Sequence, residues 1–272
     1  MAATRYTIGI DVGGTKTALG LFDGAMLLTQ SRRPSDVSLP PEEFFDALLA
    51  DVAKILADAG AAPDELRGVG VALPSFLRQP EGYILKTANL PLLREFPARE
   101  YLANRLHGVK IAVGNDNHAA ALAEHRHGAG RGHDNMLYCL MSTGIASGII
   151  IDGRLFRGDY GFSGESGHMI VTPGEGPLCG CGNRGCLSAY ASAALIPEHL
   201  RSRVARGEAT SLTEPYSMEQ IADAYTRGDA LAVRALDQMT RYMAVWLYNL
   251  YVTLNIRCFV FGGGLLNMRL PL

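Results

Sequence analysis

Residues 8–24 read IGIDVGGTKTALGLFDG, and this stretch decides the fold. Two apolar runs flank a turn of small residues that contains Gly13 and Gly14, and Asp23-Gly24 follows the second run. Asp-Gly between two apolar runs is a strong signal for a β-hairpin. The stretch therefore predicts three consecutive strands. They are Tyr6–Asp11, Lys16–Phe22 and Ala25–Ser31.

The same pattern recurs at residues 138–154, which read YCLMSTGIASGIIIDGR. A turn of small residues again separates two apolar runs, and Asp152-Gly153 closes the second one. A repeated opening of this kind predicts two similar α/β domains facing each other across a cleft, although any two hairpins look alike. We expect domains at residues 1–115 and 116–272, with the boundary near Val113–Asn117.

Apolar periodicity between and after the hairpins predicts helices and further strands, which gives an α/β fold class. Asp116 is expected at the N-cap of its helix. The expected helices are Pro41–Asp58, Glu95–Leu106, Asp116–Arg126, Ser188–Arg206, Ser217–Arg227 and Asp229–Asn255. The further strands are Arg67–Leu73, Lys110–Val113, Asn135–Met141, Ser147–Asp152 and Arg257–Phe261.

Composition excludes several classes of partner. The chain has 272 residues and a net charge of −2, which leaves no electrostatic footprint for nucleic acid or an anionic membrane. The beginning of the chain, Met1–Ile10, lacks the pattern of a signal peptide. The apolar segment Met243–Leu254 falls short of the ~18–20 residues needed to span a bilayer. Five cysteines without a secretory signal favour a reducing compartment, so we expect a cytoplasmic protein.

The turn after the first strand, Asp11-Val-Gly-Gly-Thr-Lys16, has the composition of a phosphate-binding loop. Gly13 and Gly14 let the backbone approach a ligand, and consecutive N–H groups in such a turn can bind an anion. Thr15 adds a hydroxyl donor and Lys16 a positive charge, while Asp11 is placed to hold a phosphate-bound Mg²⁺. An ordinary glycine hairpin is the alternative interpretation.

Other residues extend this candidate site. Thr143 and Gly144, in the turn of the second hairpin, and Gly263, after the last strand, are further candidate nucleotide contacts. Asp116, next to Asn115, lies between a strand and a helix, where a carboxylate can accept a hydrogen bond from a substrate hydroxyl, as phosphoryl transfer requires. A plain helix cap is the alternative role for this carboxylate.

A metal site is indicated by the pattern H-x10-C-x-C-x4-C, formed by His168, Cys179, Cys181 and Cys186. Three thiolates and one imidazole are a complete tetrahedral ligand set for Zn²⁺. Because the set leaves no open position for water, the predicted zinc is structural and not catalytic. A cluster of free cysteines is the alternative.

Five motifs, in this order and spacing, resemble the ROK family of bacterial sugar kinases and repressors, over residues 6–264. They are Asp11-x-Gly-Gly-Thr-Lys16, Asn89-Leu-Pro91, Asn115-Asp116, Gly164-Glu-x-Gly-His168 and Cys179-x-Cys-Gly-x-x-Gly-Cys186. The resemblance implies the actin-like ATPase fold (sugar kinase, ribonuclease H-like), with two α/β domains around a central cleft that holds ATP and a hexose. A homodimer is common in this family.

The resemblance also implies residue roles. Asp116 is the expected general base on the sugar 6-hydroxyl, and Asn89, Asn115, Glu165 and His168 are expected to bind ring hydroxyls. His168 would use one ring nitrogen for the sugar and the other for zinc. The expected activity is ATP- and Mg²⁺-dependent phosphorylation of a hexose or N-acetylhexosamine.

Three departures from the family pattern favour an alternative to an active kinase. In this alternative the protein is a sugar-binding or regulatory member of the same family whose catalysis is absent or impaired. Ser188 stands where family kinases have a carboxylate, residues 142–148 are bulkier than the usual glycine-rich loop, and the chain ends at Leu272, where family members continue. Repressor members begin with a DNA-binding module. This chain begins at the first strand, so we expect no nucleic-acid partner.

Overall fold

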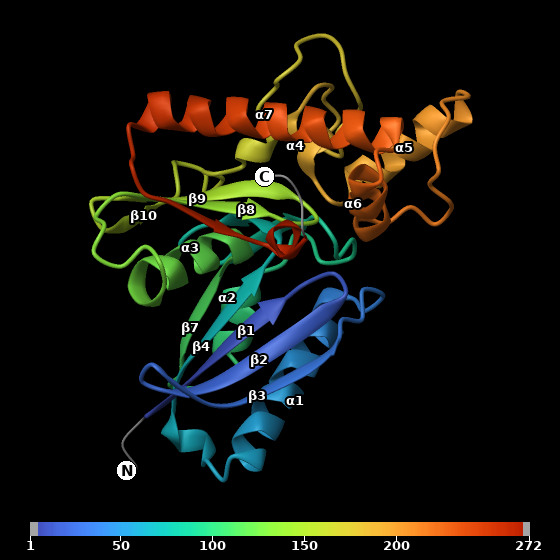
Figure 1. Cartoon of the computed structure of the whole chain (residues 1–272). Coiled ribbons are helices and arrows are strands. Elements are labelled where there is room, and N and C mark those ends of the chain that lie inside the picture. The colour runs from blue at the N-terminus through green and yellow to red at the C-terminus, as the bar shows by residue number, and fades with distance from the viewer. Residues whose placement is uncertain (1–4, 269–272) are drawn as a thin grey trace. The chain divides into compact units, whose positions relative to one another are not determined.

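The computed structural model describes residues 5–268, and the chain divides into two compact units (Figure 1). Unit 1 comprises Met1–Ala119 and Gly158–Phe162, and unit 2 comprises Ala120–Arg157 and Ser163–Leu272. The division falls inside helix α3 (Asp116–His127), whose first turn belongs to unit 1.

The main sheet of unit 1 has the strand order β3-β2-β1-β4-β7 within the described residues. β1, β2 and β3 are antiparallel neighbours, whereas β4 is parallel to β1 and β7 is parallel to β4. This arrangement confirms the predicted opening hairpins. The bounds are β1 Tyr6–Val12, β2 Lys16–Asp23, β3 Met26–Pro34, β4 Leu66–Leu73 and β7 Lys110–Asn115.

Helix α1 (Pro41–Asp58) buries one face in the core of unit 1, as its periodicity predicts. A short 3-10 turn, η1 (Pro63–Glu65), then leads into β4. Helix α2 (Ala98–Ala103) is shorter than the predicted Glu95–Leu106. Its start is delayed because Phe96 pairs with Ile84 in a β-bridge, which holds the chain extended up to Pro97.

A second, two-stranded sheet in unit 1 pairs β5 (Ser75–Arg78) with β6 (Tyr83–Thr87). The sequence pattern does not predict these strands. They are short, and the stretch between them contains Pro80 and Gly82, so no period-2 pattern of usable length exists.

The sheet of unit 2 has the order β10-β9-β8-β11 within the described residues, and it repeats the order and directions of the first four strands of unit 1. β9 begins at Ile145 and not at the predicted Ser147, because a hydrogen bond from Ser142 N to Gly144 O (2.9 Å) closes a tighter turn. The bounds are β8 Met136–Met141, β9 Ile145–Ile151, β10 Arg154–Phe156 and β11 Phe259–Gly262.

Besides the larger part of α3, the described residues of unit 2 contain the helices α4 (Leu187–Ala191), α5 (Leu195–Ala205), α6 (Met218–Thr226) and α7 (Ala230–Leu254), with short 3-10 turns η2 (Ser166–His168) and η3 (Gly264–Asn267). The prediction of a single helix at Ser188–Arg206 is wrong, because the structure has two helices there, α4 and α5. The chain breaks at Ser192 because Ala193 N and Ala194 N donate hydrogen bonds to Ser142 O and Thr143 O in the turn between β8 and β9.

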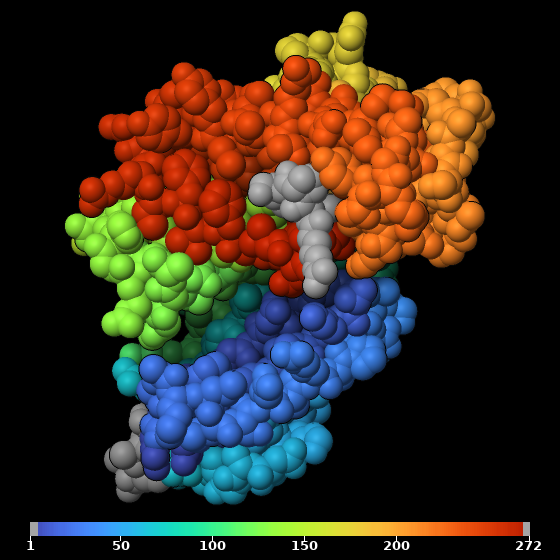
Figure 2. Space-filling model, in the orientation of Figure 1, coloured from blue at the N-terminus to red at the C-terminus, as the bar shows by residue number. Residues whose placement is uncertain are grey.

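Helix α7 runs across one face of unit 2 (Figures 1 and 2). Its inner side, which includes Met243 and Trp246, packs with residues of β8 and β9 in the core of this unit. Its outer side leaves Tyr248 65% exposed. No helix within residues 5–268 has the length and apolar character needed to cross a membrane.

Candidate active site and metal centre

Strand register brings Asp11 and Asn115-Asp116 to one edge of the sheet of unit 1. Asp11 pairs with Ala72 on β4, and Ala72 pairs in turn with Gly114 on β7. The carboxyl ends of the three parallel strands therefore lie level. This edge is where open α/β sheets bind their ligands.

Asp116 is the first residue of α3, so the prediction that it is the N-cap of this helix is wrong. Asn115 takes that role, since its Oδ1 accepts a hydrogen bond from His118 N at 3.1 Å. The Nδ2 of Asn115 donates to Ser75 O (3.3 Å), which ties the cap to β5. Asp116 Oδ1 accepts from the adjacent Asn117 N at 2.8 Å. The carboxylate of Asp116 is therefore not used to cap the helix.

The electrostatic environment of Asp116 favours proton uptake. Burial raises the pKa of Asp116 above its usual range, and the nearby Asp11 carboxylate raises it further. Asp11 itself is exposed. The raised pKa makes the Asp116 carboxylate a better proton acceptor, and carboxylate oxygens are also the ligands that Mg²⁺ uses in proteins.

The predicted phosphate loop is a closed turn that contacts Asn89. Gly13 N donates to Lys16 O at 2.9 Å, and Ser35 N donates to Thr15 O at 3.1 Å. A Cβ on Gly14 would lie 2.7 Å from the Cβ of Asn89, so the missing side chain is what admits Asn89 against the turn. Thr15 and Lys16 are exposed. Their hydroxyl and ammonium groups are thus accessible to a ligand.

A corresponding edge exists in unit 2, at the carboxyl ends of β8 and β11. Gly263 has a φ of 110°, and a Cβ there would lie 2.3 Å from Met141 O, so the residue must be glycine for the two strand ends to meet. Thr143 and Gly144 lie in the exposed turn beside it. The three predicted nucleotide contacts of unit 2 are therefore gathered on one edge.

The segment with Glu165 and His168 is pressed onto β9. Ser147 N donates to Gly164 O at 2.7 Å, and a Cβ on Gly167 would lie 2.0 Å from Ile145 O. These backbone approaches fix the position of the 3-10 turn η2, which ends at His168.

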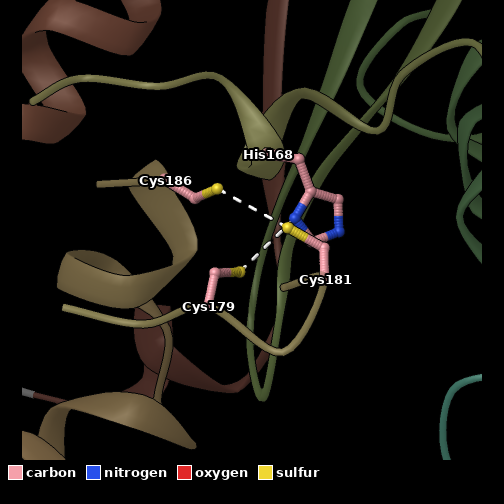
Figure 3. Close-up of side chains that lie close together, drawn as sticks. All are labelled: His168, Cys179, Cys181 and Cys186. Atoms are coloured by element: carbon pink, nitrogen blue, oxygen red, sulfur yellow. Dashed lines mark hydrogen bonds between the residues drawn. The ribbon is translucent and has the colours of Figure 1, made fainter. Parts of the chain in front are cut away.

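His168, Cys179, Cys181 and Cys186, named here the Cys3His cluster, converge in unit 2 (Figure 3). Their four candidate ligand atoms lie within 4.8 Å of one another. The Sγ atoms of Cys181 and Cys186 are 3.7 Å apart, and Cys179 Sγ is 3.5 Å from His168 Nδ1. A tetrahedral ion with Zn–S ≈ 2.3 Å and Zn–N ≈ 2.0–2.1 Å requires edges of about 3.8 and 3.5 Å. The separations therefore fit a zinc ion.

Burial raises the pKa of the Cys179 thiol and raises that of Cys186 to about 12. Buried neighbouring thiols therefore need a cation if they are to ionise together, which a soft divalent metal provides. Asn183, which sequence analysis did not assign, donates its Nδ2 to Cys181 Sγ at 3.6 Å. The position of Asn183 between Cys181 and Cys186 is the sequence signal that could have identified it as a partner of the cluster.

His168 connects the cluster to Glu165. Its Nδ1 faces Cys179, whereas its Nε2 is 3.8 Å from Glu165 Oε2. A carboxylate on the second nitrogen of a metal-binding imidazole fixes the ring and its tautomer. The predicted site residues thus form two groups: Asp11, Asn89, Asn115, Asp116 and the first turn in unit 1, and the remainder in unit 2.

Known proteins are similar to this chain in sequence and in fold. A sequence profile of the ROK family matches residues 7–270. The glucokinase of Streptomyces coelicolor is 31% identical over 271 residues, covering 95% of this chain and 82% of that protein. A xylose repressor of Bacillus subtilis is also 31% identical, over 92% of this chain, which spans 62% of the repressor.

Two solved structures share the fold. The ROK hexokinase of Thermus thermophilus is 33% identical with a TM-score of 0.82, covering 97% of this chain and 83% of that one. A ROK family glucokinase of Streptomyces griseus, in complex with glucose and AMPPNP, is 30% identical with a TM-score of 0.76, covering 96% and 84%. These likenesses confirm the expected α/β fold, that of the actin-like ATPases.

Proposed function

The chain is a sugar kinase of the ROK family, and we propose that it transfers the γ-phosphate of ATP to the 6-hydroxyl of a hexose or N-acetylhexosamine. The observation that carries the proposal is the position of Asp116 beside Asp11, at the carboxyl edge of the sheet of unit 1, with a raised pKa. This is the requirement for a general base acting on a sugar hydroxyl.

In the proposed reaction, Asp116 accepts the proton of the sugar hydroxyl as its oxygen bonds to the γ-phosphorus. The bond between that phosphorus and the oxygen that bridges it to ADP breaks, and ADP leaves. A Mg²⁺ bound with ATP would neutralise phosphate charge, and Asp11 is the residue proposed to hold it. The first turn, with Gly13, Gly14, Thr15 and Lys16, would bind the phosphates through its N–H, hydroxyl and ammonium groups.

The proposal gives unit 2 two tasks. Thr143, Gly144 and Gly263 would contact the nucleotide, through the hydroxyl of Thr143 and through the backbone of the two glycines. Glu165 and His168 would bind sugar hydroxyls, as would Asn89 and Asn115 of unit 1. The Cys3His cluster would hold a structural Zn²⁺ that fixes His168, since the four ligands leave no position for a reacting water.

A second candidate function is sugar-responsive regulation without catalysis. The xylose repressor among the relatives favours it, and so does Ser188, a buried neutral side chain beside Gly167, which lies between Glu165 and His168. Under this alternative the protein binds a sugar but releases no ADP.

A coupled assay of ADP release over a panel of hexoses and N-acetylhexosamines, with Mg²⁺ and ATP, separates these functions. We expect turnover with at least one sugar, and phosphorus NMR of the product should show a 6-phosphate. Sugar-dependent thermal stabilisation without ADP release from any sugar would favour the regulatory alternative. Zinc content is measured on the same preparation, and light scattering tests the expected homodimer.

A further inference from the structure

A pocket of about 590 Å³ opens in unit 2, apart from every residue assigned above to sugar, ATP or metal. Its walls come from α5, from α7 and from the loop that carries the cysteines. That loop contributes Leu178 and Arg184, α5 and its C-cap contribute Arg203 and Arg206, and α7 contributes Gln238. The volume lies within the range of small-molecule sites, about 300–1,000 Å³.

The pocket continues into a second hollow of about 500 Å³, with which it shares Arg203 and Gln238. Five of the described lining residues of the two hollows are arginines, and Asp237 is the one acidic residue among them. The chain as a whole has a net charge of −2. The excess positive charge is therefore local to these hollows. The arginines are Arg184, Arg203, Arg206, Arg234 and Arg241.

Among the described residues, three of these arginines, Arg184, Arg206 and Arg241, form no ion pair with a carboxylate. Glu208 binds Arg203 (2.7 Å) and Arg234 (2.9 Å), which together lower its pKa to about 2 despite the opposing effect of burial. Arg184 Nη1 instead donates to the carbonyl oxygen of Gly176, another lining residue of the pocket, at 3.2 Å.

The rest of the lining suits an organic body attached to an anion. Leu178, Ile196 and Leu200 supply apolar surface, and Ser202 supplies a hydroxyl. Burial lowers the pKa of His199, so its imidazole is neutral at physiological pH and can hydrogen-bond without adding charge. Guanidinium groups bind phosphate through two parallel hydrogen bonds.

We propose that this arginine pocket binds a phosphorylated small molecule, a phosphate monoester on a compact organic body, at a site separate from the kinase reaction. The size of the pocket, which is that of a small-molecule site, favours such a ligand over an acidic protein segment, which would need a broader surface. The combination of unbalanced Arg184 and Arg206 with a partly apolar wall carries the inference.

The pocket wall and the Cys3His cluster share one loop. Leu178 and Arg184 line the pocket, while Cys179 and Cys181 lie between them in the chain. A ligand that orders this wall would also order Cys179 and Cys181, which belong to the same cluster as His168. Resting on the proposed function, the expected consequence is that ligand and sugar change each other's affinity by the same factor.

Calorimetric titration with 3-phosphoglycerate tests the binding itself, with glyceric acid as the same organic body without phosphate. We expect a Kd of about 1 mM or tighter for 3-phosphoglycerate, weakening with salt, and no binding of glyceric acid. Arg184→Ala/Arg206→Ala should weaken binding about tenfold or more, because two charge-assisted hydrogen-bonding groups are lost. Arg131→Ala/Arg154→Ala removes two exposed arginines of unit 2 outside the pocket and should leave the Kd unchanged.

Equal binding of glyceric acid, equal losses in both double variants, or no heat with either 3-phosphoglycerate or inorganic phosphate would overturn the proposal. If Arg184→Ala/Arg206→Ala has a lowered melting temperature, Arg206→Gln replaces it in the titration, because this variant removes one exposed charge and retains most of the side-chain volume. It should also weaken binding of 3-phosphoglycerate. The readout is binding, so it is independent of whether the kinase proposal holds.

Discussion

The two units share a sheet order but carry different chemistry at the same edge. β3-β2-β1-β4 in unit 1 corresponds to β10-β9-β8-β11 in unit 2, with the same strand directions. In unit 1 the carboxyl edge carries Asp11 and Asp116, whereas in unit 2 it carries Thr143 and Gly263. The repeated frame sets positions, and the loop residues set the chemistry.

The units also differ in how their reactive groups are fixed. Asp11 and Asp116 are held by strand register and by the first turn of a helix. The cysteines lie on a loop of turns and isolated bridges, outside the sheet and the longer helices of unit 2. Unit 2 should therefore depend on a metal for its order, and unit 1 should not.

The largest expected effect follows from removing that metal. Cys186→Ser should reduce bound zinc from one ion per chain to near none and lower the melting temperature by about 10 °C, because structural zinc contributes directly to folding. Metal analysis and calorimetry are the measurements. Cys258→Ser, a half-buried cysteine outside the Cys3His cluster, is the matched control and should keep its zinc. A metal-free wild-type protein with unchanged melting would contradict the account.

The next effect concerns how closely the segment with Glu165 and His168 approaches β9. Gly167→Ala should destabilise the protein by about 2–4 kcal/mol, because the new Cβ would overlap Ile145 O at 2.0 Å. Gly180→Ala, where a Cβ meets nothing within 4 Å, should cost about 1 kcal/mol or less. Urea unfolding gives both values, and equal costs would show that η2 is not pressed onto the strand.

Asp229 tests a smaller stabilising contribution that is confined to unit 2. Its carboxylate caps α7 by accepting from Leu231 N and Ala232 N (both 3.0 Å), and it also accepts from Ser211 N at 2.6 Å. Burial opposes the charge, but these hydrogen bonds outweigh it and hold the pKa of Asp229 well below its usual range. Asp229→Ala should cost about 1–2 kcal/mol at neutral pH.

The pH dependence has a definite sign. Because the pKa of Asp229 is lower in the folded state, its contribution is complete above the unfolded value of about 3.9 and is lost as the pH falls toward the folded value. Unfolding curves of wild type and variant should converge in acid. Asp237→Ala, on the exposed side of the same helix, should remain close to wild type at every pH.

The smallest expected effect separates positioning from stability in unit 1. Gly14→Ala should displace Asn89, because their Cβ atoms would lie 2.7 Å apart. Asn89 is exposed and can move, so we expect little change in melting temperature but a rise of about three- to tenfold in the KM for sugar. An unchanged KM would remove Asn89 from the proposed sugar site.

The sequence was informative where local chemistry is strong. Asp23-Gly24 marked a hairpin, and three cysteines within eight positions marked the cluster. It was uninformative where distant contacts decide. The break at Ser192 depends on carbonyl groups of residues 142 and 143, and the bridge from Phe96 to Ile84 shortens α2. The capping role of Asn115 could not be separated from that of Asp116, since both residue types cap helices.

The central claim is that Asp116 is the base for phosphoryl transfer, and turnover of Asp116→Asn measured together with sugar binding tests it most directly. We expect a loss of about 10²–10⁴-fold in kcat with sugar affinity and zinc content retained. The melting temperature should stay or rise, since the removed charge is disfavoured by burial and by Asp11. Asp64→Asn, an exposed carboxylate of unit 1, should match wild type. Wild-type turnover in Asp116→Asn would contradict the account.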